Sequence, residues 1–253
     1  MQEIKDKLIV ALDVETLEKA ESLVNKLFPL VTIFKVGSQL FTACGPEAVK
    51  MIGEKGARVF LDLKFHDIPN TVYSAVASGT SSSVVIYSVP TGLEGAKIED
   101  QVKKSVHFFP VFMMTLHTIA GKEALKEAVR GASEKVKELN REKPYLIGVT
   151  VLTSDEGEDV TNLVLERAKL AQETGLDGVV CSVHEAAAVR KACGKDFIIV
   201  TPGIRPKDAK RDDQKRIATA KEALAAGADF LVVGRPIIES PDPLSAVKDL
   251  TEG

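Results

Sequence analysis

Short apolar runs alternate along the chain with longer amphipathic segments. The apolar runs are nearly continuous and rich in β-branched residues, which is typical of strands that are buried on both faces. The amphipathic segments have the apolar spacing of helices, and several end in glycine, as helices often do. Eight apolar runs occur: "LIVALD", "TIFKVG", "RVFLDLK", "VFMMTLH", "YLIGVTVL", "DGVVCS", "FIIVTPG" and "FLVVGR". This order predicts an α/β fold, a single (β/α)8 TIM-barrel domain over residues 1–253.

Polar residues gather at the C-terminal ends of the predicted strands, or just beyond them. The carboxyl ends of barrel strands form one mouth, where active sites are built. One charge at a strand end is equally well explained as a group that faces solvent, but seven polar groups together favour a site. They are Asp13, Lys35, Asp62, Lys64, Ser154, Arg205 and Arg235.

One segment does not fit eight strand–helix units. Residues 85–110 lie between the predicted helix "NTVYSAVASGTSSS" and the strand "VFMMTLH", and they contain an extra strand-like run and an extra helix-like one. A connection from helix to strand lies on the N-terminal face of a barrel, away from the catalytic mouth. We therefore expect an inserted surface excursion there, with an assembly contact as the functional alternative.

Composition and charge favour small-molecule partners. The chain has 253 residues, 45% hydrophobic and 27% charged, with a net charge of -3, so a basic nucleic-acid footprint is not expected. Cys44, Cys181 and Cys193 form no CxxC pair, which is typical of reduced cytosolic thiols. The N-terminal apolar run is too short for a signal peptide or a membrane span. These features predict a cytoplasmic protein without membrane contact.

The stretch "FLDLKFHDIPNT" carries the strongest chemical signal. Asp62 and Lys64 are two residues apart on a strand, so both side chains can point into the barrel mouth. Asp67 follows the strand in a loop closed by a proline, and Lys35 ends the neighbouring strand. Removing two carboxylates and two ammoniums from water costs free energy, and pairing them offsets that cost only in part. A cluster of four such charges is therefore poorly explained by stability alone. A preorganised charged row aimed at a reacting centre is favoured over a structural ion-pair cluster.

A second signal lies after the last two predicted strands, where barrels often bind phosphate. Gly203 and Gly234 permit close approach of the backbone, and Arg205 and Arg235 offer forked donors that suit phosphate oxygens. The pattern predicts a phosphorylated substrate. Arg235 as an ordinary ion-pair residue on a helix is the alternative.

Together these motifs resemble the orotidine 5'-monophosphate decarboxylase family. The resemblance rests on "ALD", "FKVG", "DLKFHDIPNT", "TVLTS", "TPGIR" with "DDQKR", and "VVGR", and it covers almost the whole chain outside residues 85–110. It implies conversion of orotidine 5'-monophosphate (OMP) to UMP and carbon dioxide in de novo pyrimidine biosynthesis, without cofactor or metal. It also implies a homodimer.

The resemblance implies a role for each matching residue. Lys64 would protonate C6 of the pyrimidine, Asp62 would lie beside the departing carboxylate, and Lys35 would complete the charged row. Of the other matching residues, one group would reach the neighbouring subunit and a second group would bind the rest of the substrate. Asp67, Ile68 and Thr71 would be lent across the dimer interface; Asp13 would bind ribose, Ser154 and Pro202 the pyrimidine, and Gln214, Arg205 and Arg235 the phosphate.

Three alternatives stay open. A sugar-phosphate decarboxylase or aldolase of the same barrel group would share DxKxxD but use Mg²⁺, and an ammonium at Lys35 would repel that ion. A non-catalytic phosphate-binding barrel would be favoured by loss of a charged residue from the row, and none is lost. A metal hydrolase is disfavoured because the four histidines show neither HxH nor HxxxH spacing.

Overall fold

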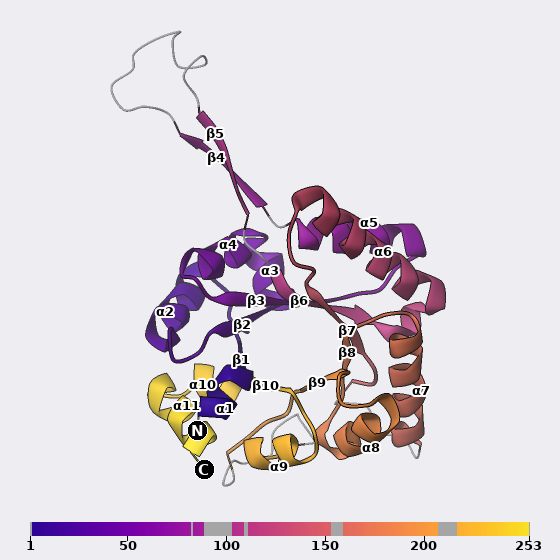
Figure 1. The fold of residues 1–253 in the computed structure, drawn as a ribbon. Coiled ribbons are helices and arrows are strands. Elements are labelled where there is room, and N and C mark those ends of the chain that lie inside the picture. The colour runs from indigo at the N-terminus through magenta and orange to yellow at the C-terminus, as the bar shows by residue number, and fades with distance from the viewer. Residues whose placement is uncertain are drawn as a thin grey trace, which may run out of the picture.

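A closed barrel of parallel strands forms the body of the molecule (Figure 1). The computed structural model describes residues 2–81, 83–88, 103–108, 111–152, 159–206 and 217–252. Within these residues the strand order around the barrel is β1-β10-β9-β8-β7-β6-β3-β2, and β1 pairs with β2 to close it. The barrel strands are β1 (Leu8–Ala11), β2 (Ile33–Gly37), β3 (Arg58–Phe65), β6 (Val111–His117), β7 (Tyr145–Val149), β8 (Gly178–Val180), β9 (Ile198–Thr201) and β10 (Phe230–Val233). The predicted (β/α)8 fold is confirmed.

Helices surround the barrel, and local sequence signals mark where several begin. The side chain of Thr16 caps one helix, and Thr219 forms a capping box with Glu222 at another. No helix in the described part of the chain is long and apolar enough to span a membrane. The helices are α1 (Gln2–Lys7), α2 (Leu17–Leu27), α3 (Ser38–Cys44), α4 (Glu47–Glu54), α5 (Pro69–Thr80), α6 (Lys122–Leu139), α7 (Val160–Glu173), α8 (Val183–Cys193), α9 (Ala220–Ala225), α10 (Arg235–Ile238), α11 (Pro243–Glu252) and the 3-10 turn η2 (Thr118–Ala120).

Two apolar clusters follow from the alternation of side chains along the strands. One lies between strands and helices. The other fills the barrel interior and has one fully or almost fully buried residue from each of six strands: Ile9, Ile33, Phe60, Met113, Ile147 and Val200. The barrel is therefore a packed core below its mouth, and polar chemistry is confined to the C-terminal strand ends.

A two-stranded antiparallel ribbon lies outside the barrel and projects away from it (Figure 1). It consists of β4 (Ser83–Ser88) and β5 (Lys103–Phe108), paired from Ser83 with Phe108 to Ser88 with Lys103. Residues 89–102 lie outside the described residues. The predicted extra strand-like run corresponds to β4, whereas β5 was not anticipated. Its strand conformation depends on pairing with β4, a contact that periodicity along one segment does not reveal.

Candidate active site

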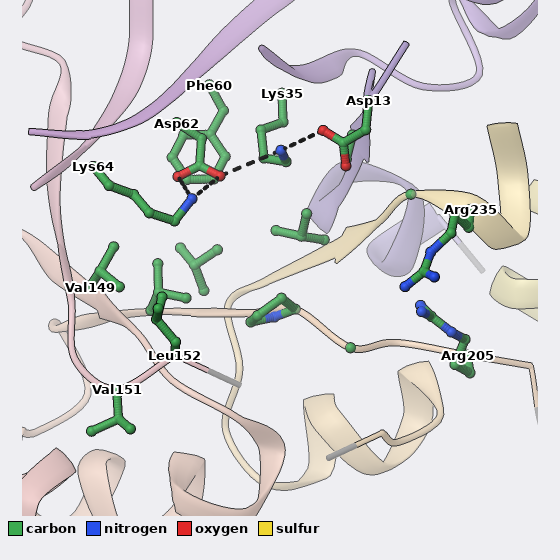
Figure 2. A pocket seen from close by; sticks show the side chains of 17 residues that line it. Asp13, Lys35, Phe60, Asp62, Lys64, Val149, Val151, Leu152, Arg205 and Arg235 are labelled. Atoms are coloured by element: carbon green, nitrogen blue, oxygen red, sulfur yellow. Dashed lines mark hydrogen bonds and ion pairs between the residues drawn. The ribbon is translucent and has the colours of Figure 1, made fainter. Parts of the chain in front are cut away.

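A cavity of about 240 Å³ opens at the C-terminal ends of the barrel strands. Its apolar wall comes from valines on four strands, Val149, Val180, Val200 and Val232, with Phe60 also lining the cavity. Its charged side chains are Asp13, Lys35, Asp62, Lys64, Arg205 and Arg235 (Figure 2). Among the described residues that line the cavity, four cations against two carboxylates give a net charge of plus two, although the whole chain is acidic. The cavity therefore suits an anionic ligand with an apolar part.

Asp62 is the centre of an ion-pair network in this cavity. The Lys64 ammonium lies 2.9 Å from each carboxylate oxygen of Asp62. The Lys35 ammonium lies 3.4 Å from Asp62 Oδ2 and 3.1 Å from Asp13 Oδ1. Only 11% of the Asp62 side chain is exposed, against 38% for Lys64, so the carboxylate is held in place while one ammonium still faces the cavity.

The network keeps its buried members charged. Burial alone would raise the pKa of Asp62, but the nearby ammoniums of Lys35 and Lys64 outweigh it and hold that pKa below its usual value. Burial alone would likewise lower the pKa of Lys35, but the carboxylates of Asp62 and Asp13 outweigh it and raise that pKa. The site is therefore a fixed array of charges at neutral pH.

A bulge in β3 brings Lys64 to Asp62. The pairing of β3 with β6 steps from Leu61 with Met114 to Phe65 with Leu116, so three residues of β3 lie opposite Thr115 alone. Lys64 has a φ of 52°, in the left-handed region, which costs a non-glycine residue about 1–2 kcal/mol. Bulges beside active sites re-aim side chains. Asp62 and Lys64 therefore meet because of this bulge. Regular alternation of side chains along a strand was the cause predicted from the sequence.

Gly37 gives the Lys35 ammonium its space. A Cβ built on Gly37 would lie 2.8 Å from Lys35 Nζ and 3.3 Å from Asp13 Oδ1. The first distance is shorter than real side chains show, so any larger residue would displace the ammonium from between its two carboxylates. Glycine at the end of β2 thus leaves the Lys35 ammonium its position between the two carboxylates.

Two arginines line the cavity on the side opposite Lys64, and Figure 2 shows their guanidinium groups turned toward each other. Arg205 is buried. Its backbone N–H donates to the Ala218 carbonyl, which holds the segment after β9 against the segment before α9. Gly203 has a φ of 78°, a conformation that favours glycine. Two guanidinium groups at one end of the cavity offer positive charge and forked N–H donors, so this end suits a phosphate group.

The structure places the other predicted residues in three locations. Pro202, Gly203 and Gly234 line the cavity. Asp67, Ile68 and Thr71 are exposed in and after the loop that follows β3, and Asp67 Oδ1 accepts a hydrogen bond of 2.6 Å from the Ile68 N–H. The described charged network therefore has Asp13 as its fourth member, where the sequence predicted Asp67. Ser154 and Gln214 lie outside the described residues.

Sequence reasoning missed two residues of the site. Gly37 was not recognised because the sequence pattern does not show that the Lys35 side chain extends over the end of its own strand to reach Asp13. Thr115 is completely buried and hydrogen-bonded to both Asp62 and Lys64. Its signal was present as a lone hydroxyl within the apolar run "VFMMTLH", since a polar side chain in a buried strand needs a partner.

Fold and cavity together define the class of TIM-barrel enzymes with a fixed array of charges at the barrel mouth. The sequence model of the "Orotidine 5'-phosphate decarboxylase / HUMPS family" matches residues 6–99 and 95–250. The chain belongs to this family. The two matched parts meet within the segment that holds the ribbon.

Curated relatives and a solved structure agree with this membership. An orotidine 5'-phosphate decarboxylase from Moorella thermoacetica is 44% identical in an alignment that covers 96% of this chain and 90% of the relative. One from Syntrophotalea carbinolica is 42% identical and covers 99% of this chain and 95% of the relative. The crystal structure of the Lactobacillus acidophilus enzyme has a TM-score of 0.75 at 31% identity, with 97% of each chain covered. The predicted family and enzyme class, a carboxy-lyase, are confirmed.

Proposed function

We propose that this chain decarboxylates OMP to UMP and carbon dioxide, with Lys64 as the proton donor. The observation that carries the proposal is the placement of one Lys–Asp–Lys network and two facing arginines in a single cavity. The network provides charge at a reacting carbon, and the arginines provide a phosphate site at the other end. A nucleoside monophosphate with a carboxylate has both features.

The chemistry needs a positioned cation. When the bond between C6 and the carboxylate breaks, its electron pair stays on C6 as a carbanion without an adjacent electron sink. The Lys64 ammonium stabilises that charge and then transfers a proton from Nζ to C6, which gives UMP; the neutral amine regains a proton from water. Asp62 fixes the ammonium by two contacts of 2.9 Å and lies where the departing carboxylate would be repelled.

Substrate binding divides the cavity into three parts. Arg205, Arg235 and Gln214 would bind the phosphate, and Gly203 and Gly234 would let backbone amides approach it. Asp13, at the rim beside Lys35, would accept hydrogen bonds from ribose hydroxyls. Pro202 and Ser154 would contact the pyrimidine. The phosphate, which is remote from C6, would contribute binding energy that is used at the reacting carbon.

A cytoplasmic homodimer is our proposal for the assembled enzyme. The loop after β3 supports it, because Ile68 is a large apolar residue with 67% of its surface exposed, and such exposure beside polar groups marks interaction sites. Asp67, Ile68 and Thr71 would complete the cavity of the partner subunit. The cellular location rests on the sequence composition described above.

The contacts of Lys35 disfavour the Mg²⁺-dependent alternative. Its ammonium lies between the carboxylates of Asp13 and Asp62, at 3.1 and 3.4 Å. A divalent cation would need those same oxygens and would meet a positive charge. Among the described residues, no group of three or more His, Cys, Asp or Glu side chains is arranged to hold a metal ion.

Ultraviolet absorbance of OMP mixed with the purified protein in excess EDTA tests the proposal. We expect rapid conversion to the UMP spectrum. Lys64→Ala should lower turnover by at least about 10³-fold, because it removes both the field and the proton, while circular dichroism stays unchanged. Lys50→Ala is the matched control, since Lys50 pairs with Glu47 on α4 and is not among the described residues that line the cavity. Conversion that survives Lys64→Ala would remove Lys64 from the mechanism.

A further inference from the structure

Thr115 closes a hydrogen-bonded ring around the bulge of β3. Its hydroxyl oxygen lies 2.9 Å from the Lys64 backbone nitrogen and 2.9 Å from Asp62 Oδ1. A backbone N–H can only donate, so the hydroxyl accepts from Lys64 and uses its single proton for Asp62. The ring is completed where the Lys64 ammonium meets the same carboxylate at 2.9 Å. One side chain thus joins the backbone of one charged residue to the head group of the other.

The ladder between β3 and β6 explains why this hydroxyl is needed. The bulge leaves Thr115 as the one β6 residue between the paired positions Met114 and Leu116. The Lys64 N–H donates to a side chain of β6 at the point where the regular pairing is interrupted. Without Thr115 Oγ1 this half-buried donor would lose this hydrogen-bond partner, and the left-handed φ of 52° at Lys64 would lose a bond that holds it.

We infer that Thr115 is a positioning residue for the charged pair of Asp62 and Lys64, an inference that rests on the proposed function. Thr115 is completely buried and does not line the cavity, so it acts through the two residues that it joins. It fixes the Lys64 backbone and the plane of the Asp62 carboxylate at once. The ammonium is thereby held at one place before substrate arrives.

Four variants separate this role from simple packing. Thr115→Val keeps the shape and removes both hydrogen bonds; Thr115→Ser keeps the hydroxyl and removes a methyl group; Thr115→Ala is used if the valine variant does not fold. The matched control is Thr174→Val, since Thr174 is also buried but donates to the Leu170 and Ala171 carbonyls at the end of α7.

We expect Thr115→Val to lower kcat roughly 10- to 100-fold, the effect of displacing a reacting group by about 1 Å. KM for OMP should change less than about threefold, because the arginine end of the cavity is untouched. Thr115→Ser should restore kcat to within about threefold of the wild type, and Thr174→Val should leave kcat unchanged. Wild-type kcat in both Thr115→Val and Thr115→Ala, or equal loss in the serine and valine variants, would overturn the inference.

Hydrogen exchange at the Lys64 amide provides a readout that does not depend on turnover. The amide should exchange at least about tenfold faster in Thr115→Val than in the wild type or Thr115→Ser, because its acceptor is gone. Unchanged exchange would overturn the positioning role. If the wild type did not convert OMP, the proposed substrate would fail, whereas the exchange data would still decide whether Thr115 holds Lys64.

Discussion

At the scale of single residues, the chemistry depends on Asp62 being ionised while almost fully buried. Three donors make this possible: two ammoniums and the Thr115 hydroxyl. Two of these donors also have a second attachment, since Lys35 meets Asp13 and Thr115 meets the Lys64 backbone. Losing any one member leaves a buried charge without its full set of partners, which costs more than the pair itself contributes.

The pKa of Asp62 makes part of the stability depend on pH. Its folded-state pKa lies below the ordinary value of 3.8, so the unfolded chain takes up a proton before the folded protein does. The stabilisation is complete above that ordinary value and is lost as the pH falls through the lower folded-state pKa. Asp62→Asn should therefore destabilise the protein by about 3 kcal/mol near pH 7, and this difference should shrink as the pH approaches about 2.

Urea unfolding across this pH range measures the effect. Asp196→Asn is the control, because Asp196 is exposed before β9 and should change stability by less than about 0.5 kcal/mol at any pH. If the difference in the free energy of unfolding between the wild type and Asp62→Asn stays constant with pH, ionisation of Asp62 does not stabilise the fold.

The charged residues of the site could be predicted from sequence, because charges at the ends of buried strands are rare enough to be informative. Asp13, Lys35, Asp62 and Lys64 were found in this way. Thr115 was not, since its role depends on a contact between strands that are far apart in sequence: it is 53 positions from Asp62. Gly37 was not, since its role depends on where the Lys35 side chain lies, which the sequence does not show. The residues that sequence reasoning missed are those whose role is defined by a contact in the folded protein and not by the type of side chain.

At the scale of elements, the barrel closes without the ribbon. Strands β3 and β6 pair directly, and β4 and β5 form a separate sheet. The barrel strands could be predicted because their apolar runs reflect burial on both faces. Of the ribbon, only the strand-like run at β4 was predicted, since the pairing of two short strands with each other has no such signature. An isolated two-stranded ribbon is only marginally stable in water, so the barrel gains little from it.

Excision of the ribbon tests its independence. Replacing residues 82–110 by two glycines joins Ser81 to Val111 by a connection of ordinary length for a barrel. Turnover of OMP should stay within about threefold of the wild type, and the thermal midpoint within about 3 °C, because no described residue of the cavity is removed. A variant that fails to fold would show that residues 82–110 are part of the barrel's folding unit.

At the scale of the whole molecule, charge is distributed unevenly. The chain carries a net charge of -3, whereas the described cavity holds an excess of two positive charges. A cationic cavity in a chain of net negative charge attracts anions to that cavity. The loop of Asp67, Ile68 and Thr71 is exposed, so these residues are available to a second copy of the chain.

A mixture of two inactive variants tests whether the cavity is shared between subunits. Lys64→Ala and Asp67→Ala should each be nearly inactive as homodimers, and co-refolding them should give heterodimers in about half of the molecules. One cavity of each heterodimer then combines an intact Lys64 with an intact Asp67 of the partner, so activity should return to about one quarter of the wild type. Mixing Lys64→Ala with Lys35→Ala is the control. Lys35 and Lys64 both act in the cavity of their own chain, so each cavity of a mixed dimer lacks one of them. This mixture should therefore restore no activity if Asp67 is the residue that crosses the dimer interface. Activity in the control mixture equal to that of the test mixture would contradict a contribution from the partner subunit.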